Sequence, residues 1–365
     1  MALRARRLAR PLRRLAVGAR TRGWENNSRL FVVGDLSGWS VDEDAEHIAA
    51  AARRLGYEVA PPHWAGLATG QSVFHTSHFE ALTPRWLDGA DRLGVAYMHG
   101  RPGTRDMPEF DAVWDALRRR PERVDRVQVT HEEMRALVLE AGVPAERIFL
   151  IPLGIDLDAF PLVDEGRRDT ARRALGLPRD AWVVGSFQKD GVGWGAGLDP
   201  KTIKGPDVLV RVLERLRGDV PELHVLLTGP SRGWVRGELD RLGIRYTHVV
   251  AATRRELGRA YHALDVYLVT SRQEGGPKAA LETAAAGIPL VSTRVGQASE
   301  LHEHERTAAL VDVDDVDGLA GWAGRVRDGA GRQWRDPARR LAEAHAHERL
   351  DAEWAALLDG FVTRP

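Results

Sequence analysis

Short apolar runs alternate with amphipathic stretches from residue 24 onward, a pattern typical of parallel α/β sheets. The alternation occurs in two series, separated by a stretch rich in proline, glycine and charge at 152–179. We therefore expect an α/β protein with two Rossmann-like domains, each near the roughly 150 residues of an ordinary domain. The predicted strands are 30–33, 73–75, 95–98, 126–130 and 148–151 in the first series, and 182–187, 224–228, 247–250, 266–269, 289–292 and 309–311 in the second.

The same pattern predicts the domain boundaries. They are a tail at 1–23, a first domain at 24–160, a linker at 161–180, a second domain at 181–336, and a final helix at 337–365 that crosses back to the first domain. Ligands of open parallel sheets bind outside the carboxyl ends of the strands, so the cleft between two such domains is the expected site. Other predicted helices are 44–55, 107–119, 132–140, 205–216, 234–242, 254–263, 277–286 and 316–328.

Several classes of site are excluded by what the sequence lacks. The chain has no cysteine, which excludes disulfides, thiolate metal sites and cysteine nucleophiles. It has no P-loop motif, and the GxGxxA match at 191–196 is followed by Asp199 and Pro200 where a helix would have to open. His75 and His78 have a metal-compatible spacing but no third ligand in the sequence pattern, so no metal is expected.

The net charge of zero conceals a strongly basic N-terminus. Residues 1–22 hold eight arginines and no acid, so the remaining chain carries 44 basic and 52 acidic residues. Three interpretations stay open for the tail: a disordered solvated segment, an interfacial segment attracted to anionic membrane, or an organelle transit peptide. Nucleic acid is not an expected partner, because the tail lacks aromatic residues and the body is acidic. The expected location is cytoplasmic, or peripheral at the inner face of the membrane.

Lysine is rare in this chain and therefore informative. Of the 52 basic residues, 48 are arginine, a bias typical of GC-rich coding. A compact ammonium differs from a guanidinium as a phosphate partner, so the few lysines indicate positions where that group is needed. All lie in the second half of the chain: Lys189, Lys201, Lys204 and Lys278.

The segment 270–296 has the richest pattern, and it follows the predicted strand 266–269. Pro277 suits a first helical turn and Gly287 suits the residue after a helix, which brackets a helix at 277–286. The free N–H groups at the start of that helix form an anion site for a phosphate. Gly275 and Gly276 would allow the phosphate to approach closely.

Glu274 precedes this helix, and Glu282 lies within it, eight residues later. At 1.5 Å per residue they lie roughly 12 Å or more apart, beyond the separation of about 5–9.5 Å that glycosidase carboxylates use. We expect them to hold two different parts of one extended ligand. The alternative is a capping glutamate and a surface glutamate without a ligand.

The segments 274–277, 281–284 and 287–291 resemble the EX7E signature of family 4 glycosyltransferases, which have the GT-B fold. Three further segments resemble that family in order and spacing. The resemblance covers about residues 145–315, and the first 140 residues match in architecture only. The further segments are the inter-domain motif at 147–160, the lysine–glycine motif at 203–207 and the strand end at 226–229.

The resemblance implies roles for specific residues of the second half. Glu274 would contact the donor sugar, Glu282 the nucleotide ribose, and Lys204 the donor diphosphate. The family's arginine after the first strand of this domain is absent, and Lys189 is the candidate substitute. Leu153 replaces the asparagine of the inter-domain motif. An unusual insertion at 190–202 separates the two lysines.

The resemblance also implies ligand contacts at three other positions. Gly34 opens a glycine-containing loop after the first strand, which approaches the donor phosphates and the acceptor. Gly229 stands at the end of a strand on the donor side. His99 resembles the family's histidine near the sugar, with a purely structural histidine as the alternative.

The function implied is transfer, with retention, of a sugar from a UDP- or GDP-linked donor to a carbohydrate, lipid-linked or small-molecule acceptor. No cofactor or metal is implied beyond the nucleotide-sugar donor. Two other functions stay open: a GT-B nucleotide-sugar epimerase, and a catalytically silent protein that binds nucleotide sugars or glycans. An epimerase would need no acceptor.

Overall fold

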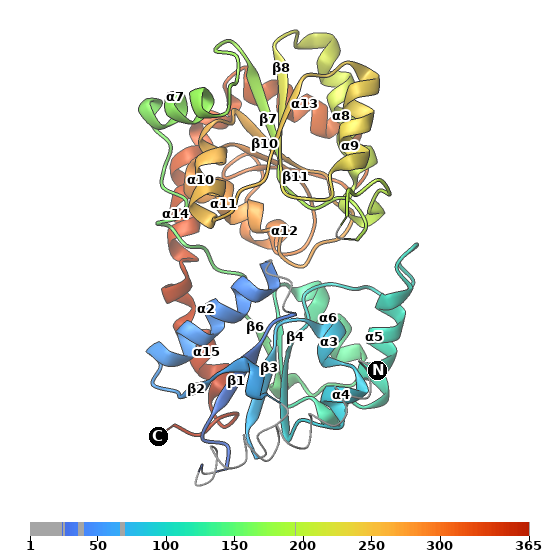
Figure 1. Ribbon diagram of the computed structural model, residues 1–365, viewed down its shortest axis with the longest axis vertical. Helices are drawn as coiled ribbons and strands as arrows, with labels where there is room; N and C mark the ends of the chain where they lie inside the picture. The colour runs from blue at the N-terminus through green and yellow to red at the C-terminus, as the bar shows by residue number, and fades with distance from the viewer. Residues whose placement is uncertain (1–23, 25, 36–39, 66–69, 194, 365) are drawn as a thin grey trace, which may run out of the picture. The chain divides into compact units, whose positions relative to one another are not determined.

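The computed structural model describes residue 24 and residues 26–35, 40–65, 70–193 and 195–364. The chain divides into two compact units (Figure 1). Unit 1 comprises Met1–Ile151 and His347–Pro365, and unit 2 comprises Pro152–Ala346. Each unit contains a six-stranded sheet whose strand pairings are all parallel. The basic tail predicted to contact membrane lies outside the described residues.

The sheet of unit 1 has the strand order β2-β1-β3-β4-β5-β6. Its strands are β1 (Leu30–Val33), β2 (Val59–Ala60), β3 (Ser72–His75), β4 (Arg92–Ala96), β5 (Arg126–Val129) and β6 (Ile148–Leu150). Its helices are α2 (Ser40–Arg54), α3 (His78–Ala81), α4 (Pro84–Leu87), α5 (Pro108–Arg119), α6 (Glu132–Glu140) and α15 (Asp351–Leu358).

The sheet of unit 2 has the order β12-β11-β10-β7-β8-β9. Its strands are β7 (Trp182–Ser186), β8 (Leu223–Thr228), β9 (Tyr246–Val249), β10 (Val266–Val269), β11 (Leu290–Thr293) and β12 (Ala309–Val311). Its helices are α7 (Glu165–Ala174), α8 (Pro206–Asp219), α9 (Gly233–Leu242), α10 (Arg254–His262), α11 (Lys278–Ala286), α12 (Ala298–Leu301), α13 (Val316–Arg327) and α14 (Arg335–Ala344).

The inner strands β7, β8 and β10 of unit 2 are mostly apolar because both faces of the sheet are covered by helices. Alternate residues of β10 enter opposite cores: Val266 packs with α8, α9 and α13, whereas Tyr267 packs with α7, α10, α11 and α14. Figure 1 shows α8 and α9 on one side of this sheet and α10 and α11 on the other. This layering explains why the sequence shows continuous apolar runs in place of strict alternation.

The predicted strands are confirmed with small shifts, apart from one larger displacement. β4 begins at Arg92 and ends at Ala96, whereas the prediction was 95–98. The strand begins earlier because Arg92 pairs with Ser72 of β3 and Leu93 is buried in the core. His99 therefore lies three residues beyond the strand end. The two-residue strand β2 was not predicted.

The predicted return of the C-terminal segment to the first domain is confirmed, but the prediction of one continuous helix at 337–365 is wrong. The segment contains α14, a 3₁₀ turn at His347–Leu350 and α15. The break occurs where the carbonyl of His345 accepts a hydrogen bond of 3.0 Å from the Ile155 amide, in a bridge between Ile155 and Ala346. Beyond it, α15 packs on α2 and β6 within unit 1.

The predicted linker at 161–180 is also wrong, because this segment packs into unit 2. It contains α7, and Val163 and Ala171 are buried in the same core as Tyr261. Arg168 and Arg172 of α7 form ion pairs of 2.8 and 2.6 Å with Asp265. The division between the units instead falls between Ile151 and Pro152.

The order β10-β7-β8 places three loops at one edge of the second sheet. These loops follow the carboxyl ends of adjacent parallel strands, where ligands of such sheets bind. They begin at Thr270, Phe187 and Gly229. Across the described part of the chain, no helix has the length and apolar character required to cross a bilayer.

Candidate functional site

Lys204 and Glu274 form an ion pair at the carboxyl edge of the second sheet. The lysine ends a 3₁₀ turn at Thr202–Lys204, and the glutamate lies in the loop after β10. Lys204 Nζ is 2.6 Å from Glu274 Oε2, and Glu274 is only 8% exposed. Ser271 Oγ donates a 2.7 Å hydrogen bond to Glu274 Oε1. Both carboxylate oxygens therefore have partners.

Gly205 explains how the Lys204 turn lies against the loop after β10. Its backbone is left-handed, with φ of 60°, and a Cβ atom there would lie 1.9 Å from the carbonyl oxygen of Thr270. Thr270 Oγ1 donates a 2.9 Å bond to the Gly205 carbonyl. The amide of Arg272 donates a 2.8 Å bond to the carbonyl of Ile203. The two segments are thus connected through their backbones, which fixes Lys204 relative to Glu274.

Arg272 strengthens this connection and was not singled out by the sequence. Its guanidinium donates two bonds, of 2.8 and 2.6 Å, to the carboxylate of Asp207. It also bonds Asp314 at 2.7 Å and the carbonyl of Thr202 at 2.8 Å. Hydrogen bonding to Asp207 raises the pKa of Arg272. Among 48 arginines, its sequence position carried no distinguishing signal.

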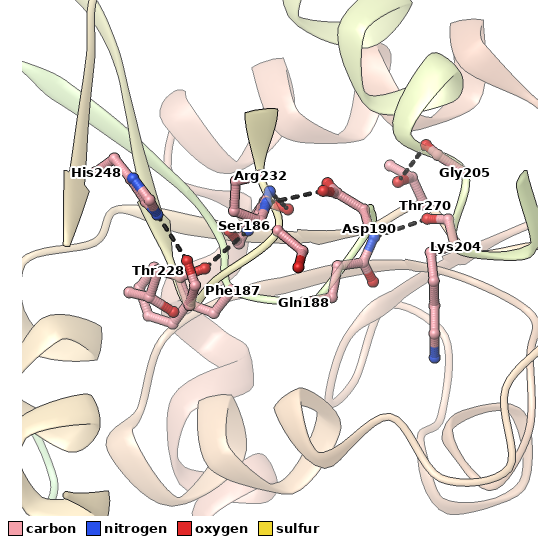
Figure 2. Close-up of polar contacts among 12 residues, drawn as sticks. Ser186, Phe187, Gln188, Asp190, Lys204, Gly205, Thr228, Arg232, His248 and Thr270 are labelled. Carbon is pink, nitrogen blue, oxygen red and sulfur yellow. Dashed lines mark hydrogen bonds and ion pairs between the residues drawn. The ribbon is translucent and has the colours of Figure 1, made fainter. Parts of the chain in front are cut away.

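Gln188 joins the end of β7 to the same site and was also missed. Its Nε2 donates a 2.7 Å bond to the carbonyl of Lys204 (Figure 2). Its Oε1 lies 3.1 Å from Ser271 Oγ. Gln188 thereby places the next residue, Lys189, near Lys204. Burial, followed by the Lys204 charge, lowers the pKa of Lys189 below its usual range.

Glu282 is buried in α11, with 3% exposure, so it is not the surface residue of the alternative interpretation. Tyr261 Oη donates a 2.6 Å hydrogen bond to Glu282 Oε2. Arg254 Nη2 lies 2.6 Å from Glu282 Oε1. Burial, together with the Glu282 charge, raises the pKa of Tyr261 well above its ordinary value. The carboxylate is held in one orientation by two donors.

The start of α11 differs from the prediction by one position. The helix is Lys278–Ala286, and Pro277 is its N-cap in place of its first helical residue. Gly287 ends the helix with φ of 73°, as predicted. A Cβ atom at Gly276 would lie 2.7 Å from Leu153 Cδ1 and 2.9 Å from Gln297 Cδ, so a larger residue there would have to displace these side chains.

Gln297 packs against this glycine-containing loop. The side-chain Oε1 of Gln297 accepts a 2.7 Å hydrogen bond from the Leu153 backbone amide. The backbone amide of Gln297 donates a 3.0 Å bond to the Gly275 carbonyl. Its side-chain nitrogen is buried without a hydrogen-bond partner among the described residues. The side chain of Leu153, which replaces the family asparagine, lies in this same contact.

Gly229 ends β8 with φ of 84°. Its amide donates a 3.1 Å bond to the Val249 carbonyl, and its carbonyl is 2.7 Å from His248 Nε2. The residue therefore lies at the same sheet edge as Gln188 and Lys204. Its contact with a donor stays a prediction.

Gly34 and His99 are the predicted site residues of unit 1. A Cβ atom at Gly34 would lie 1.9 Å from Asp42 Oδ1, and residues 36–39 of its loop lie outside the described part. His99 is half-buried, with its ring 5.4 Å from His78 and 5.6 Å from Phe110. Burial lowers the pKa of His78 to about 3. The structure gives His99 an aromatic setting, and its role near a sugar stays a prediction.

A metal site receives no support from the geometry. His75 Nδ1 accepts a 3.1 Å bond from the Ser77 amide, which uses that nitrogen. Among the residues that the structure describes, no group of three or more histidine, aspartate or glutamate side chains could hold a metal ion. The site combines lysine ammonium groups, which attract anions, with carboxylates, which accept hydrogen bonds from hydroxyl groups.

Two family models match the chain in separate regions. Residues 44–159 match a model described as glycosyltransferase family 4, and residues 190–326 match one described as glycosyl transferases group 1. Together these matches include both units.

Solved glycosyltransferase structures share the fold. HepE of Anabaena, in complex with UDP and glucose, aligns with a TM-score of 0.73 at 16% identity and covers 92% of this chain and all of that chain. Sucrose-phosphate synthase of Thermosynechococcus elongatus aligns with a TM-score of 0.69 at 18% identity, over 92% of this chain and 99% of that chain. The GT-B architecture expected from the sequence is confirmed.

Relatives that share one name show which family the chain belongs to. A D-inositol 3-phosphate glycosyltransferase of Thermobispora bispora is 32% identical over 75% of this chain and 70% of its own length. One from Acidothermus cellulolyticus is 30% identical over 87% of this chain and 71% of its own length. The chain spans only 52% of a third, from Mycolicibacterium smegmatis, at 30% identity. With both family models matched and the first two of these relatives covered over more than two thirds of their length, the chain belongs to glycosyltransferase family 4.

Proposed function

We propose that this chain transfers a hexose from a nucleotide-diphosphate sugar to an acceptor, with retention at the anomeric carbon. The observation that carries the proposal is the Lys204–Glu274 pair, held at the carboxyl edge of the second sheet with Glu282 buried in the adjoining helix. Glu274 would contact the sugar, Lys204 the diphosphate and Glu282 the ribose. UDP is the first donor nucleotide to test, because HepE is solved in complex with UDP and glucose.

The charges at this edge match the chemistry of the step. The bond between the anomeric carbon and the β-phosphate oxygen breaks, and the acceptor oxygen bonds to that carbon on the same face. The acceptor proton passes to the departing phosphate, so no protein base is needed. Negative charge grows on the leaving diphosphate, where Lys204, Lys189 and the α11 N-terminus would stabilise it.

The names of the relatives indicate which acceptor to test first. D-inositol 3-phosphate is the acceptor to test first, alongside a simple sugar and a lipid-linked sugar. Contact of the basic tail with anionic membrane, one of the three interpretations of that segment, would favour a lipid-linked acceptor.

A donor panel followed by product analysis tests the proposal. Thermal shifts of the full chain with UDP-, GDP- and ADP-sugars identify the base, and mass spectrometry of reactions with and without acceptor identifies the chemistry. An acceptor-dependent product that retains the anomeric configuration is expected. Altered sugar without acceptor would indicate an epimerase. Donor binding without any product would indicate a silent binding protein and overturn the proposal.

A further inference from the structure

Arg232 lies buried beneath the candidate donor site, where β8 leads into α9. Its side chain has 0% exposure. The Nη1 atom donates bonds of 2.6 Å to the Ser186 carbonyl and 3.1 Å to the Thr228 carbonyl. These carbonyls end the neighbouring strands β7 and β8, so one guanidinium holds two strand ends together. Figure 2 shows the side chain directed toward Ser186 and Asp190.

The remaining contacts of Arg232 are with Asp190 and Ser186, which flank the segment 187–189. Its Nε is 2.9 Å from Asp190 Oδ1, and both side chains are almost fully buried. Its Nη2 donates a 3.3 Å bond to Ser186 Oγ. Ser186 precedes residues 187–189 and Asp190 follows them. Arg232 therefore fixes both ends of the three-residue segment that ends in Lys189.

The loop that begins at Asp190 connects the same arginine to Lys204. Its two ends are joined by a 2.7 Å bond from the Lys201 amide to the Asp190 carbonyl. The Lys204 amide in turn donates a 2.9 Å bond to the Lys201 carbonyl. Beside Arg232, the amide of Gly233 donates a 2.8 Å bond to the Ala196 carbonyl of this loop. The described residues of the insertion are thus hydrogen-bonded to one another and to Gly233, beside Arg232.

We propose that Arg232 is a positioning residue of the donor site, which holds Lys189 beside Lys204 so that both ammonium groups meet one diphosphate. It does not touch the donor itself, because its guanidinium is enclosed and directed at Asp190, Ser186 and Thr228. The ligand named here rests on the proposed function, whereas the placement of Lys189 does not.

The lysines themselves provide a readout that needs no ligand. The chain has only four, so reductive ¹³C-dimethylation of the full protein gives a spectrum with few signals, and Lys189→Arg assigns the one of interest. In Arg232→Met we expect the Lys189 signal to shift and its pKa to rise toward the ordinary lysine range, because Lys189 would leave the position where burial, and then the Lys204 charge, lowers its pKa. The exposed Arg236, on α9, gives the matched control Arg236→Met, which should change neither the Lys189 signal nor its titration.

Removal of one member of a buried ion pair can prevent folding. The neutral pair Arg232→Met with Asp190→Asn avoids that problem and should give the same Lys189 shift. A folded variant of either kind whose Lys189 signal and titration equal those of the wild type would overturn the inference.

A double-mutant cycle on UDP binding tests the link to the donor. Arg232→Lys keeps a cation near Asp190 but cannot bond both strand ends, so UDP affinity should fall about tenfold. In a Lys189→Met background the same change should cost less than about twofold, because the two residues act as one unit. An equal loss in both backgrounds contradicts the inference. If the wild type binds no UDP, GDP or ADP, the proposed function fails, and the lysine spectrum still decides the role of Arg232.

Discussion

The Lys204 ammonium lies 2.6 Å from the Glu274 carboxylate, so the two residues predicted to hold the donor also form an ion pair with each other. A diphosphate would draw Lys204 toward its own charge and leave Glu274 available to the sugar hydroxyls. The ion pair, together with the Ser271 hydrogen bond, fixes the Glu274 carboxylate relative to Lys204.

The first prediction concerns this pair. Glu274→Gln keeps the shape and the Ser271 contact but removes the charge, and Lys204→Met removes the ammonium. Each should lower the rate of transfer by at least about 10², because preorganised charges act on the transition state. Circular dichroism and steady-state kinetics with the identified donor check the outcome. Exposed Arg236→Lys serves as the control, and wild-type rates in both folded variants would contradict the site assignment.

The second prediction concerns Tyr261, whose hydroxyl donates to Glu282 at 2.6 Å. Tyr261→Phe leaves a buried carboxylate oxygen without its donor, which should lower the free energy of unfolding by about 1–3 kcal/mol. Donor affinity should fall as well, because Glu282 loses its fixed orientation. Urea unfolding and calorimetric titration measure the two effects.

Tyr246→Phe is the matched control for Tyr261. Its hydroxyl makes only a 3.4 Å exposed contact with Asp240, so stability should stay within about 0.5 kcal/mol of the wild type. If Tyr261→Phe is as mild as this control, Tyr261 does not orient Glu282.

The sequence predicted the strands and the Glu274 segment because both are local patterns. Apolar runs mark strands buried on two faces, and Pro277 and Gly287 mark the ends of one helix within a residue. Gly205 also fits its motif for a local reason, since its left-handed φ of 60° favours glycine, whereas its close contact with Thr270 is distant in sequence.

The supporting side chains could not be predicted, because their partners are distant in sequence. Arg232 contacts Ser186, 46 residues away, and Arg272 contacts Asp207, 65 residues away. Neither stands out among so many arginines. The break in the final helix was hidden for the same reason, since it depends on a bond from Ile155.

The third prediction concerns the basic tail. Residues 1–22 carry eight arginines and no acid, and each basic residue near an anionic surface contributes about 1 kcal/mol to binding. Deletion of residues 1–22 should therefore abolish binding to phosphatidylserine vesicles at low salt and leave binding to neutral vesicles unchanged. Co-sedimentation checks this, and equal binding of the full and shortened chains to anionic vesicles would refute a membrane role for the tail.

The last prediction concerns His302, which is buried with its Nε2 3.1 Å from the Ala280 carbonyl and its Nδ1 3.1 Å from Thr307 Oγ1. Burial lowers the pKa of this histidine from 6.5 to about 4. The unfolded chain therefore takes up a proton as the pH falls through 6.5, whereas the folded chain does not until about pH 4. The stability contributed by a neutral His302 is complete above pH 6.5 and is lost between these two values.

At pH 5 that loss should amount to about 2 kcal/mol relative to pH 7. His302→Gln can still donate to Ala280 but does not titrate, so its free energy of unfolding should fall less between pH 7 and pH 5 by about this amount. Urea unfolding at the two pH values measures the difference, and the exposed His63→Gln should retain the wild-type loss. An identical loss in His302→Gln and the wild type would mean that His302 does not remain neutral in the folded chain at pH 5.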